Sequence, residues 1–451
     1  MRQKLPEKTA EGSAAAETIF APATAAGRAA IAVLRLSGPA AGPALARLSG
    51  GLPPPRHARH ARLRDPGSGE FLDDGIVLWF PAPNSATGED MAELQVHGSR
   101  AVLAALFEIL RQDGLRLAEP GEFTRRAFLN GKLDLLEAEA VADLVAAETE
   151  AQRRQAARQL AGAQGALYRG WSQRLTRLLA HLEAAIDFPD EDLPPQIEAE
   201  IAKDTGALVG EIAGHLADGH RGERLRDGIG VAILGPPNAG KSSLLNRIAR
   251  REAAITSAIP GTTRDIVEVA IDLAGYPLVL ADTAGLRETA DPVEREGLRR
   301  ALARAEEAEL RLFVFEAGRP QDAKAASAWP GADTLIVANK ADLCSTPPKL
   351  LPEGALLVSA LTGAGIEALL AALGQRAAEA YKSEAPVVTR ARHRAALEEA
   401  LAALYRSEAA ALPELRAEDL RLAWRSLGHI TGAVDVEDLL DIIFRDFCLG
   451  K

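Results

Sequence analysis

The apolar and polar positions follow one pattern in the first third of the chain and another in its middle. Short β-branched and apolar runs at residues 31–36 and 75–80 predict strands. From Leu133 to about Leu216, apolar residues recur at helical spacing with few glycines, and prolines interrupt the pattern at 188–195. We therefore expect a mixed α/β segment followed by packed helices.

The rest of the chain predicts an α/β unit inserted between helices. After residues 226–230, strand, glycine-containing loop and helix alternate to about Gly374, which is the order typical of a parallel sheet. Helical spacing then returns from Arg390 to Phe447. The α/β unit therefore interrupts an all-helical domain whose two halves flank it.

Length and composition agree with a modular globular protein. A chain of 451 residues is too long for one core, and 47% hydrophobic with 25% charged residues is ordinary for soluble domains. Apolar runs stay well short of the roughly 18 to 20 residues that span a bilayer, and the N-terminus lacks a secretory pattern. We expect a cytoplasmic protein without a membrane partner. Its two cysteines, Cys344 and Cys448, do not suggest a disulfide framework.

The net charge of −11 argues against a whole-surface electrostatic hold on nucleic acid, so we expect any such contact to be local or shared with a partner. One basic run offers either a local patch or, as the favoured interpretation, a solvated surface strand or loop. It consists of Arg56, His57, Arg59, His60, Arg62 and Arg64.

A phosphate-binding loop follows the first strand of the inserted unit. The buried run 231–234 leads into Gly235-Pro236-Pro237-Asn238-Ala239-Gly240-Lys241-Ser242, and a helix follows at 243–248. This strand, loop and helix context is the one the P-loop pattern requires, because free N–H groups at a helix start attract phosphate. Lys241 is expected to reach the β and γ phosphates, and the Ser242 hydroxyl is expected to bind Mg²⁺.

Two downstream segments resemble nucleotide switches. Residues 261–265 contain Thr263, which is expected to close on Mg²⁺ and the γ-phosphate. The predicted strand 277–281 ends at Asp282-Thr283-Ala284-Gly285, where the carboxylate would hold the metal directly or through water.

The choice of base is predicted by Asn339-Lys340-Ala341-Asp342, which follows the apolar run 334–338. The Asp342 carboxylate can accept hydrogen bonds from guanine N1–H and the 2-amino group, whereas adenine lacks that donor pair. Ser359-Ala360-Leu361 would supply backbone amides near guanine O6. These segments together predict GTP rather than ATP.

The group that orients the hydrolytic water is harder to identify from the sequence than the nucleotide contacts. Leu286 occupies the position where many small GTPases carry a water-orienting glutamine, so another polar group is needed. Arg287, Glu288 and Glu294 are candidates on the stretch that follows. Asn238 in the phosphate loop offers a carbonyl oxygen for a monovalent cation, which would serve in place of an arginine finger.

The predicted domains are then a tail (1–16), an N-terminal mixed α/β domain (17–132), a discontinuous helical domain (133–225 and 377–451) and an inserted Ras-like G domain (226–376). The predicted GTP-contacting residues are Asn238, Ala239, Gly240, Lys241, Ser242, Ser243, Ser257, Ala258, Ile259, Pro260, Gly261, Thr262, Thr263, Asp282, Thr283, Ala284, Gly285, Asn339, Lys340, Ala341, Asp342, Ser359, Ala360 and Leu361.

Beyond residue 16 the chain resembles the MnmE (TrmE) family of tRNA-modifying GTPases. Four blocks outside the G domain carry the resemblance: 27–38, 83–90, 120–134 and 447–451. The resemblance implies a K⁺-stimulated GTPase whose G domains dimerise across the nucleotide, with Glu294 positioning the water and Thr263 and Lys241 also catalytic. It places K⁺ among Asn238, Ser257, Ile259 and Thr262.

The resemblance also implies that the N-terminal domain forms a constitutive homodimer and binds a one-carbon donor, 5-formyl- or 5,10-methylene-tetrahydrofolate. By motif matching, Arg35, Glu93, Lys132 and Lys451 fall at folate-contacting positions. Basic side chains suit the carboxylates or formyl oxygen of a folate, and a carboxylate suits the pterin N–H groups, but surface ion pairs would use the same residue types.

Family members act with a flavin- and NADH-dependent partner, MnmG (GidA), to build a carboxymethylaminomethyl or aminomethyl group on C5 of the wobble uridine of certain tRNAs. This chain has no Gly-x-Gly-x-x-Gly fingerprint after a strand, so the flavin is expected on the partner. Cys448, in a Cys-x-Gly-Lys terminus, is either a thiol with a chemical role or a small packing residue.

Some positions depart from the family pattern. The loop at residues 25–30 lacks the usual prolines, Ser99 follows His97-Gly98 where a second glycine is usual, and Glu137 replaces a glutamine. Two other functions remain open from the residues: a regulatory GTPase of ribosome assembly, and an assembly scaffold that binds GTP without useful turnover. The flanking blocks disfavour the first, and Glu294 and Asn238 disfavour the second.

Overall fold

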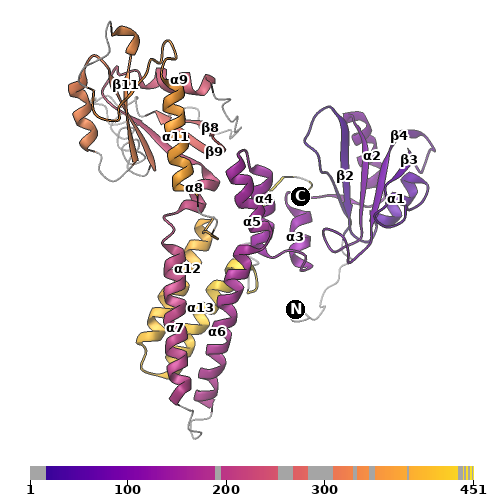
Figure 1. The fold of residues 1–451 in the computed structure, drawn as a ribbon. Coiled ribbons are helices and arrows are strands. Elements are labelled where there is room, and N and C mark those ends of the chain that lie inside the picture. The colour runs from indigo at the N-terminus through magenta and orange to yellow at the C-terminus, as the bar shows by residue number, and fades with distance from the viewer. Residues whose placement is uncertain are drawn as a thin grey trace, which may run out of the picture. The chain divides into compact units, whose positions relative to one another are not determined.

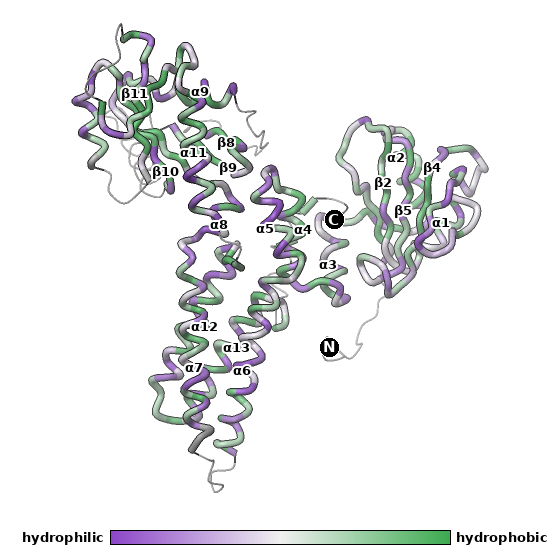
Figure 2. Tube along the Cα trace, in the orientation of Figure 1, coloured by the Kyte–Doolittle hydropathy of each residue, from purple (hydrophilic) through white to green (hydrophobic). Residues whose placement is uncertain are grey.

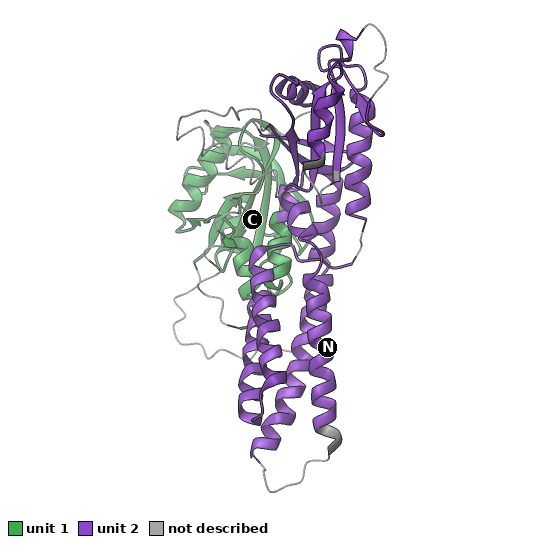
Figure 3. Ribbon diagram, turned by 90° about the vertical axis from the view of Figure 1, so that its left-hand side faces the viewer, with its two compact units in different colours: residues 1–142, 431–451 green, residues 143–430 purple. Residues whose placement is uncertain are grey.

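The structure is a computed structural model that describes residues 17–187, 195–251, 268–282, 308–328, 333–344, 351–382 and 385–434, together with 440, 443–444, 447–448 and 450. The chain divides into two compact units, shown in Figure 3: Met1–Ala142 with Thr431–Lys451, and Asp143–Ile430. Among the helices so described, none is long and apolar enough to cross a membrane.

The first unit contains a six-stranded sheet in the order β3-β4-β5-β2-β1-β6. Its strands are β1 (Ile19–Pro22), β2 (Ala29–Ser37), β3 (Arg59–Arg64), β4 (Phe71–Phe80), β5 (Met91–Gly98) and β6 (Arg116–Leu117). All neighbouring pairs are antiparallel except β1 with β6. The predicted strands at 31–36 and 75–80 are confirmed as β2 and β4.

Helices α1 (Ala41–Ser49) and α2 (Arg100–Gln112) lie beside this sheet in Figure 1. Leu34, Leu94 and Leu106 belong to the shared core and are fully buried. Strand β3 carries most of the basic run, and its burial alternates because Leu63 points to the core while Arg62 and Arg64 are exposed. The surface-strand interpretation of that run is therefore confirmed.

The chain's C-terminal segment belongs to the first unit. Helices α3 (Glu122–Leu129) and α4 (Leu135–Ala146) follow the sheet in sequence. Leu135 and Ala138 of α4 form one apolar cluster with Leu440, Phe444 and Phe447. Residues more than 300 positions apart thereby share a core.

The second unit contains helices from both sides of the inserted α/β unit. They are α5 (Glu150–Leu160), α6 (Ala163–Asp187), α7 (Pro195–Leu216), α8 (Arg221–Asp227), α12 (Ala391–Ala409) and α13 (Pro413–Thr431). Helix α7 packs against both α6 and α12, as Figure 1 shows. A helical domain with two halves separated in sequence is therefore confirmed.

The inserted α/β unit is built on a second six-stranded sheet, ordered β12-β11-β10-β7-β9-β8. Its elements are β7 (Ile229–Leu234), α9 (Lys241–Arg251), β8 (Glu268–Leu273), β9 (Tyr276–Asp282), β10 (Leu310–Glu316), η1 (Pro320–Ala328), β11 (Asp333–Asn339), η2 (Ala341–Leu343), β12 (Leu356–Leu357) and α11 (Ile366–Ala380). Figure 2 shows how apolar its strands are, and Ile233, Leu280 and Val337 are fully buried, as expected for a sheet covered on both faces.

One strand of this mainly parallel sheet runs in the opposite direction. β8 runs antiparallel to β9, whereas β7, β9, β10, β11 and β12 are mutually parallel. A two-residue turn causes the reversal, because Ala274 and Gly275 both have positive φ, 54° and 85°. Two successive positive φ angles are the signature of a tight hairpin whose twist matches its strands.

Candidate functional sites

The predicted nucleotide motifs meet at one edge of the second sheet. Because β7, β9, β10 and β11 are parallel, their carboxyl ends lie at the same edge. Asp282, the last residue of β9, pairs with Ile233 just before the phosphate loop. Glu316 at the end of β10 pairs with Asn339 at the end of β11. Such an edge is where open α/β sheets bind ligands.

The phosphate loop needs glycine at two points for steric reasons. Gly235 has φ +136°, and a Cβ there would clash with the carbonyl oxygen of Val314. Gly240 has φ +90°, and a Cβ there would clash with the side-chain amide of Asn339. Asn238 between them adopts the left-handed conformation at φ 61° and is exposed. The loop thus presses against β10 and β11 while its tip faces outward.

Lys241 lies at the start of α9 with only 7% of its surface exposed. Its Nζ donates to the carbonyl oxygens of Gly235 at 2.8 Å and Pro236 at 3.0 Å. Burial lowers the pKa of this ammonium, and the nearby charge of Asp282 opposes that shift. Ser242 and Ser243 are exposed beside it. A cation and free hydroxyls at a helix start suit a phosphate with its metal ion.

At the other end of the site, Asn339 joins the phosphate loop to residues 359–361, which we call the base loop. Its amide Nδ2 donates to the carbonyl oxygen of Ala239 at 2.9 Å and to that of Gly240 at 3.4 Å. Its Oδ1 accepts the N–H of Ala360 at 3.0 Å, and the side chain is 1% exposed.

Asp342 is exposed on η2 and accepts a hydrogen bond from the Ser359 hydroxyl. Lys340, with φ 62°, donates from Nζ to Glu316 Oε2 at 3.0 Å. This ion pair lowers the pKa of the Glu316 carboxyl. The structure therefore brings the predicted phosphate-loop and base-recognition segments into one connected site.

The rest of the predicted site lies outside the described residues, so its roles stay predictions. These residues are Ser257, Ala258, Ile259, Pro260, Gly261, Thr262, Thr263, Thr283, Ala284, Gly285, Glu294 and Lys451.

In the first unit, two of the predicted folate residues form one ion pair. Arg35 on β2 donates to Glu93 Oε1 on β5 at 3.0 Å from Nε and 2.9 Å from Nη2. Its Nη1 also donates to the carbonyl oxygen of Gly450 at 3.3 Å, and its guanidinium lies 5.9 Å from the ring centre of Phe123. The end of the chain is thereby placed beside this ion pair. Cys448 is exposed in the same terminal segment.

The predicted folate residue Lys132 contacts the loop at residues 83–90. Its Nζ donates to the carbonyl oxygen of Pro83 at 3.1 Å. Within the described residues, no hydrogen bond or ion pair joins Lys132 to Arg35 or Glu93. The neighbouring Asn130 donates to the carbonyl oxygen of Thr87 at 2.8 Å. Blocks 83–90 and 120–134, distant in sequence, thus meet.

A polar cluster that the sequence did not single out fixes these loops. Arg126 donates to Glu89 at 3.0 Å and to Glu122 at 2.9 Å. Glu89 also accepts from the buried Ser37 hydroxyl at 2.7 Å. Although burial alone would raise the pKa of Glu122, hydrogen bonds from Arg116 and Arg126 hold it below its usual value. Only the three-dimensional pairing reveals this cluster, since its members lie in separate blocks.

Two departures from the family pattern have local structural explanations. Ser99 is the N-cap of α2, and its side chain accepts the N–H of Ala101 at 3.3 Å. Glu137 accepts the N–H of Asp134 at 2.8 Å, and Asp134 accepts the N–H of Glu137 at 2.8 Å, which is a reciprocal cap at the start of α4. Both substitutions therefore support helix starts.

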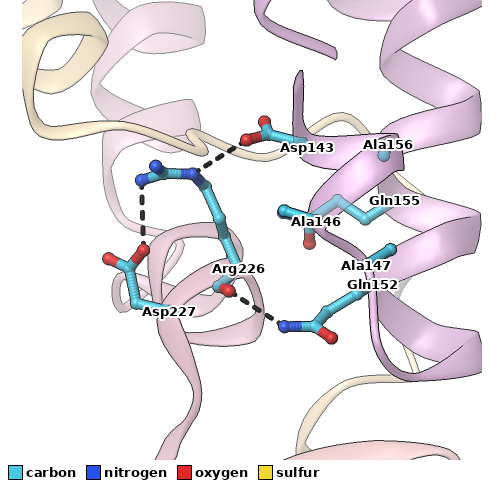
Figure 4. A pocket seen from close by; sticks show the side chains of 8 residues that line it. All are labelled: Asp143, Ala146, Ala147, Gln152, Gln155, Ala156, Arg226 and Asp227. Carbon is cyan, nitrogen blue, oxygen red and sulfur yellow. Dashed lines mark hydrogen bonds and ion pairs between the residues drawn. The ribbon is translucent and has the colours of Figure 1, made fainter. Parts of the chain in front are cut away.

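The two connections of the inserted unit share one carboxylate. Asp143 Oδ1 accepts from Arg226 Nε at 3.0 Å and from Arg390 Nη2 at 2.7 Å. Arg226 lies just before β7, and Arg390 is the residue that precedes α12 where the chain returns to the helices. Figure 4 shows the small pocket at this point, where Gln152 also donates to the Arg226 carbonyl oxygen at 3.0 Å. No feature of the sequence pattern predicted that Asp143 would contact both arginines.

A glycine-rich phosphate loop between strand and helix, with an Asn-Lys-x-Asp segment at the same sheet edge, defines the chain as a P-loop GTPase. Family models agree with the flanking domains. A model described as the MnmE helical domain matches residues 135–448, and one described as the GTP-binding protein TrmE N-terminus matches residues 18–132.

Relatives match over almost the whole chain. The tRNA modification GTPase MnmE of Rhodospirillum rubrum is 58% identical, covering 96% of this chain and 99% of the relative. That of Parvibaculum lavamentivorans is 58% identical over 96% and 100%, and that of Granulibacter bethesdensis is 53% identical over 96% and 99%. The chain belongs to the MnmE (TrmE) family and is a GTP hydrolase.

Proposed function

We propose that this chain is a GTPase of tRNA modification that helps to build the carboxymethylaminomethyl or aminomethyl group on C5 of the wobble uridine. The observation that carries the proposal is the match to relatives named tRNA modification GTPase over 96% of the chain, in both flanking domains as well as the G domain. A ribosome-assembly GTPase would not require the convergence of blocks 83–90 and 120–134 seen in the first unit.

The modification requires two co-reactants. One is bound by this chain, and the other is supplied by a partner protein. A reductant is needed, and we propose the flavoprotein MnmG as its source and as the partner protein. A one-carbon unit is also needed, and we propose a 5-formyl- or 5,10-methylene-tetrahydrofolate. Because tRNA is the substrate, we place the protein in the cytoplasm.

We propose a role for residues at each end of GTP. Lys241 would contact the β and γ phosphates, Ser242 and Thr263 would hold Mg²⁺, and Asp342 would select guanine. The buried ammonium and the exposed Ser242 hydroxyl at the start of α9 support this assignment. When bound, the metal would neutralise the charge that develops on the phosphate oxygens.

For hydrolysis we propose that Glu294 positions the water and that K⁺ binds among Asn238, Ser257, Ile259 and Thr262. The exposed, left-handed Asn238 at the tip of the phosphate loop supports an outward-facing cation site. We propose that this site faces a second G domain in a homodimer.

For the folate we propose Arg35, Glu93, Lys132 and Lys451, on the N-terminal domain at residues 17–132. The Arg35–Glu93 pair, 26% and 18% exposed at the side chains, supports a site open to a ligand. The contact of Arg35 with the Gly450 carbonyl oxygen supports the inclusion of the C-terminal segment in this proposed site.

Hydrolysis in two salts tests the cation proposal. GTP turnover is expected to rise strongly in K⁺ relative to Na⁺ for the wild-type protein, and Asn238→Ala is expected to lose most of that difference. Asn246→Ala, an exposed amide on α9, serves as the control. Equal turnover of the wild-type protein in both salts would refute the K⁺ assignment.

Mass spectrometry of tRNA nucleosides tests the substrate. Cells lacking this chain are expected to lose the C5 substituent of the wobble uridine and to regain it when the wild-type chain is restored. If the modified nucleoside persists in the deletion strain, the proposed tRNA function is wrong.

A further inference from the structure

One arginine on the helix that follows the phosphate loop holds the base loop by its backbone. Arg247 on α9 donates from Nε to the carbonyl oxygen of Ala360 at 2.8 Å, and from Nη2 to that of Leu361. The two carbonyls belong to consecutive peptide units of the loop Ser359-Ala360-Leu361. A guanidinium presents its N–H donors in a rigid planar fork, so the two contacts together fix the orientation of this backbone.

Residues 359–362 offer four backbone N–H groups near the position expected for guanine O6, and three of them are already engaged. Ser359 N–H donates to the Ala364 carbonyl oxygen at 2.9 Å, Ala360 N–H donates to Asn339 Oδ1 at 3.0 Å, and Thr362 N–H donates to Ser359 Oγ at 3.1 Å. Among the described residues, no acceptor is recorded for the Leu361 N–H. The Leu361 side chain is 75% exposed, so solvent or a ligand can approach the loop there.

Arg247 acts on the peptide unit that carries this remaining N–H. The Ala360 carbonyl and the Leu361 N–H belong to one peptide plane, so a cation on that oxygen both orients the N–H and strengthens it as a donor. Arg247 lies six positions after Lys241 on α9. One helix therefore reaches the phosphate end of the site with its first residue and the base loop with its seventh.

We propose that Arg247 is a positioning residue for guanine recognition, which aims the Leu361 N–H at O6 of the base. The inference rests on the proposed guanine-nucleotide site and adds a residue to it. Arg247 does not touch the nucleotide; it acts through the backbone of the base loop.

Competition binding with three diphosphates tests the proposal, because each changes one part of the base. GDP has O6, IDP keeps O6 but lacks the 2-amino group, and 6-thio-GDP replaces O6 with the weaker acceptor sulfur. Arg247→Ala is expected to weaken GDP and IDP about 5- to 10-fold, the value of one neutral hydrogen bond, and 6-thio-GDP by less than about twofold.

Two further variants distinguish a positioning role of Arg247 from a general loss of protein stability. Arg247→Lys is expected to recover only part of the GDP affinity, since one ammonium cannot reproduce the planar fork. Arg250→Ala removes an exposed charge from the same helix and is expected to leave all three affinities unchanged.

An equal loss for all three diphosphates in Arg247→Ala, or no loss of GDP affinity, would overturn the role of Arg247. Failure of the wild-type protein to bind any of the three would instead overturn the proposed guanine site itself.

Discussion

Asn339 is the side chain on which the nucleotide site depends most directly, and Asn339→Ala is the perturbation that tests it. The substitution removes donors to Ala239 and Gly240 of the phosphate loop and the acceptor for Ala360 of the base loop. Because Asn339 is 1% exposed, water reaches the vacated positions only if the loops separate. The two halves of the site would then no longer be held in register.

The magnitude follows from these contacts. Each neutral hydrogen bond contributes about 0.5–1.5 kcal/mol net, and a buried group left without a partner costs about 1–3 kcal/mol. Rearrangement of the loops offsets part of this, so we expect a loss of about 2–4 kcal/mol, or about 30- to 1000-fold in GDP affinity. Displacement of a fluorescent GDP analogue measures it.

Two other variants sharpen the test. Asn339→Asp keeps an acceptor for Ala360 but turns a carboxylate toward the Ala239 carbonyl oxygen, so it should bind GDP no better than Asn339→Ala. Asn246→Ala, exposed on α9, should stay within about twofold of wild type. GDP affinity within threefold of wild type in Asn339→Ala would show that Asn339 does not hold the two loops together.

Three further substitutions have expected outcomes. Gly235→Ala should abolish GDP binding and lower the thermal unfolding midpoint, because its Cβ would clash with a β10 carbonyl; Gly318→Ala, which has open space, should do neither. Arg35→Ala should weaken 5-formyl-tetrahydrofolate at least about tenfold by titration calorimetry, since a charged hydrogen bond contributes about 1.5–3 kcal/mol; unchanged affinity would remove Arg35 from the folate site. Asp143→Ala should lower the unfolding midpoint by about 2–4 °C, because two partly exposed arginines lose their shared carboxylate; an unchanged midpoint would show that this junction contributes nothing to stability.

The phosphate loop was predictable because everything that defines it is adjacent in sequence. An apolar run, two glycines and a helix start lie within residues 231–248, so the local pattern identifies the loop without knowledge of its long-range contacts. The direction of β8 was harder to predict from the sequence, because its apolar pattern fits either direction. The two positive φ angles at Ala274 and Gly275 are what reverse the chain.

Long-range contacts explain what sequence reasoning missed. Asp143 meets arginines 83 and 247 positions away, and Arg247 meets the base loop more than 110 positions away. On its own helix, Arg247 is one of several basic residues on a polar face, so nothing in its spacing distinguishes it. Such roles depend on which loops the fold brings together.

We propose that the wobble uridine is modified only when this chain hydrolyses GTP. Nucleoside mass spectrometry of tRNA from a deletion strain that carries Glu294→Ala tests this requirement, once retained GTP binding by the purified variant has been established. The modified nucleoside is expected to be absent with Glu294→Ala and present with the wild-type chain. Full modification by a variant that binds GTP but does not hydrolyse it would show that the modification does not depend on hydrolysis.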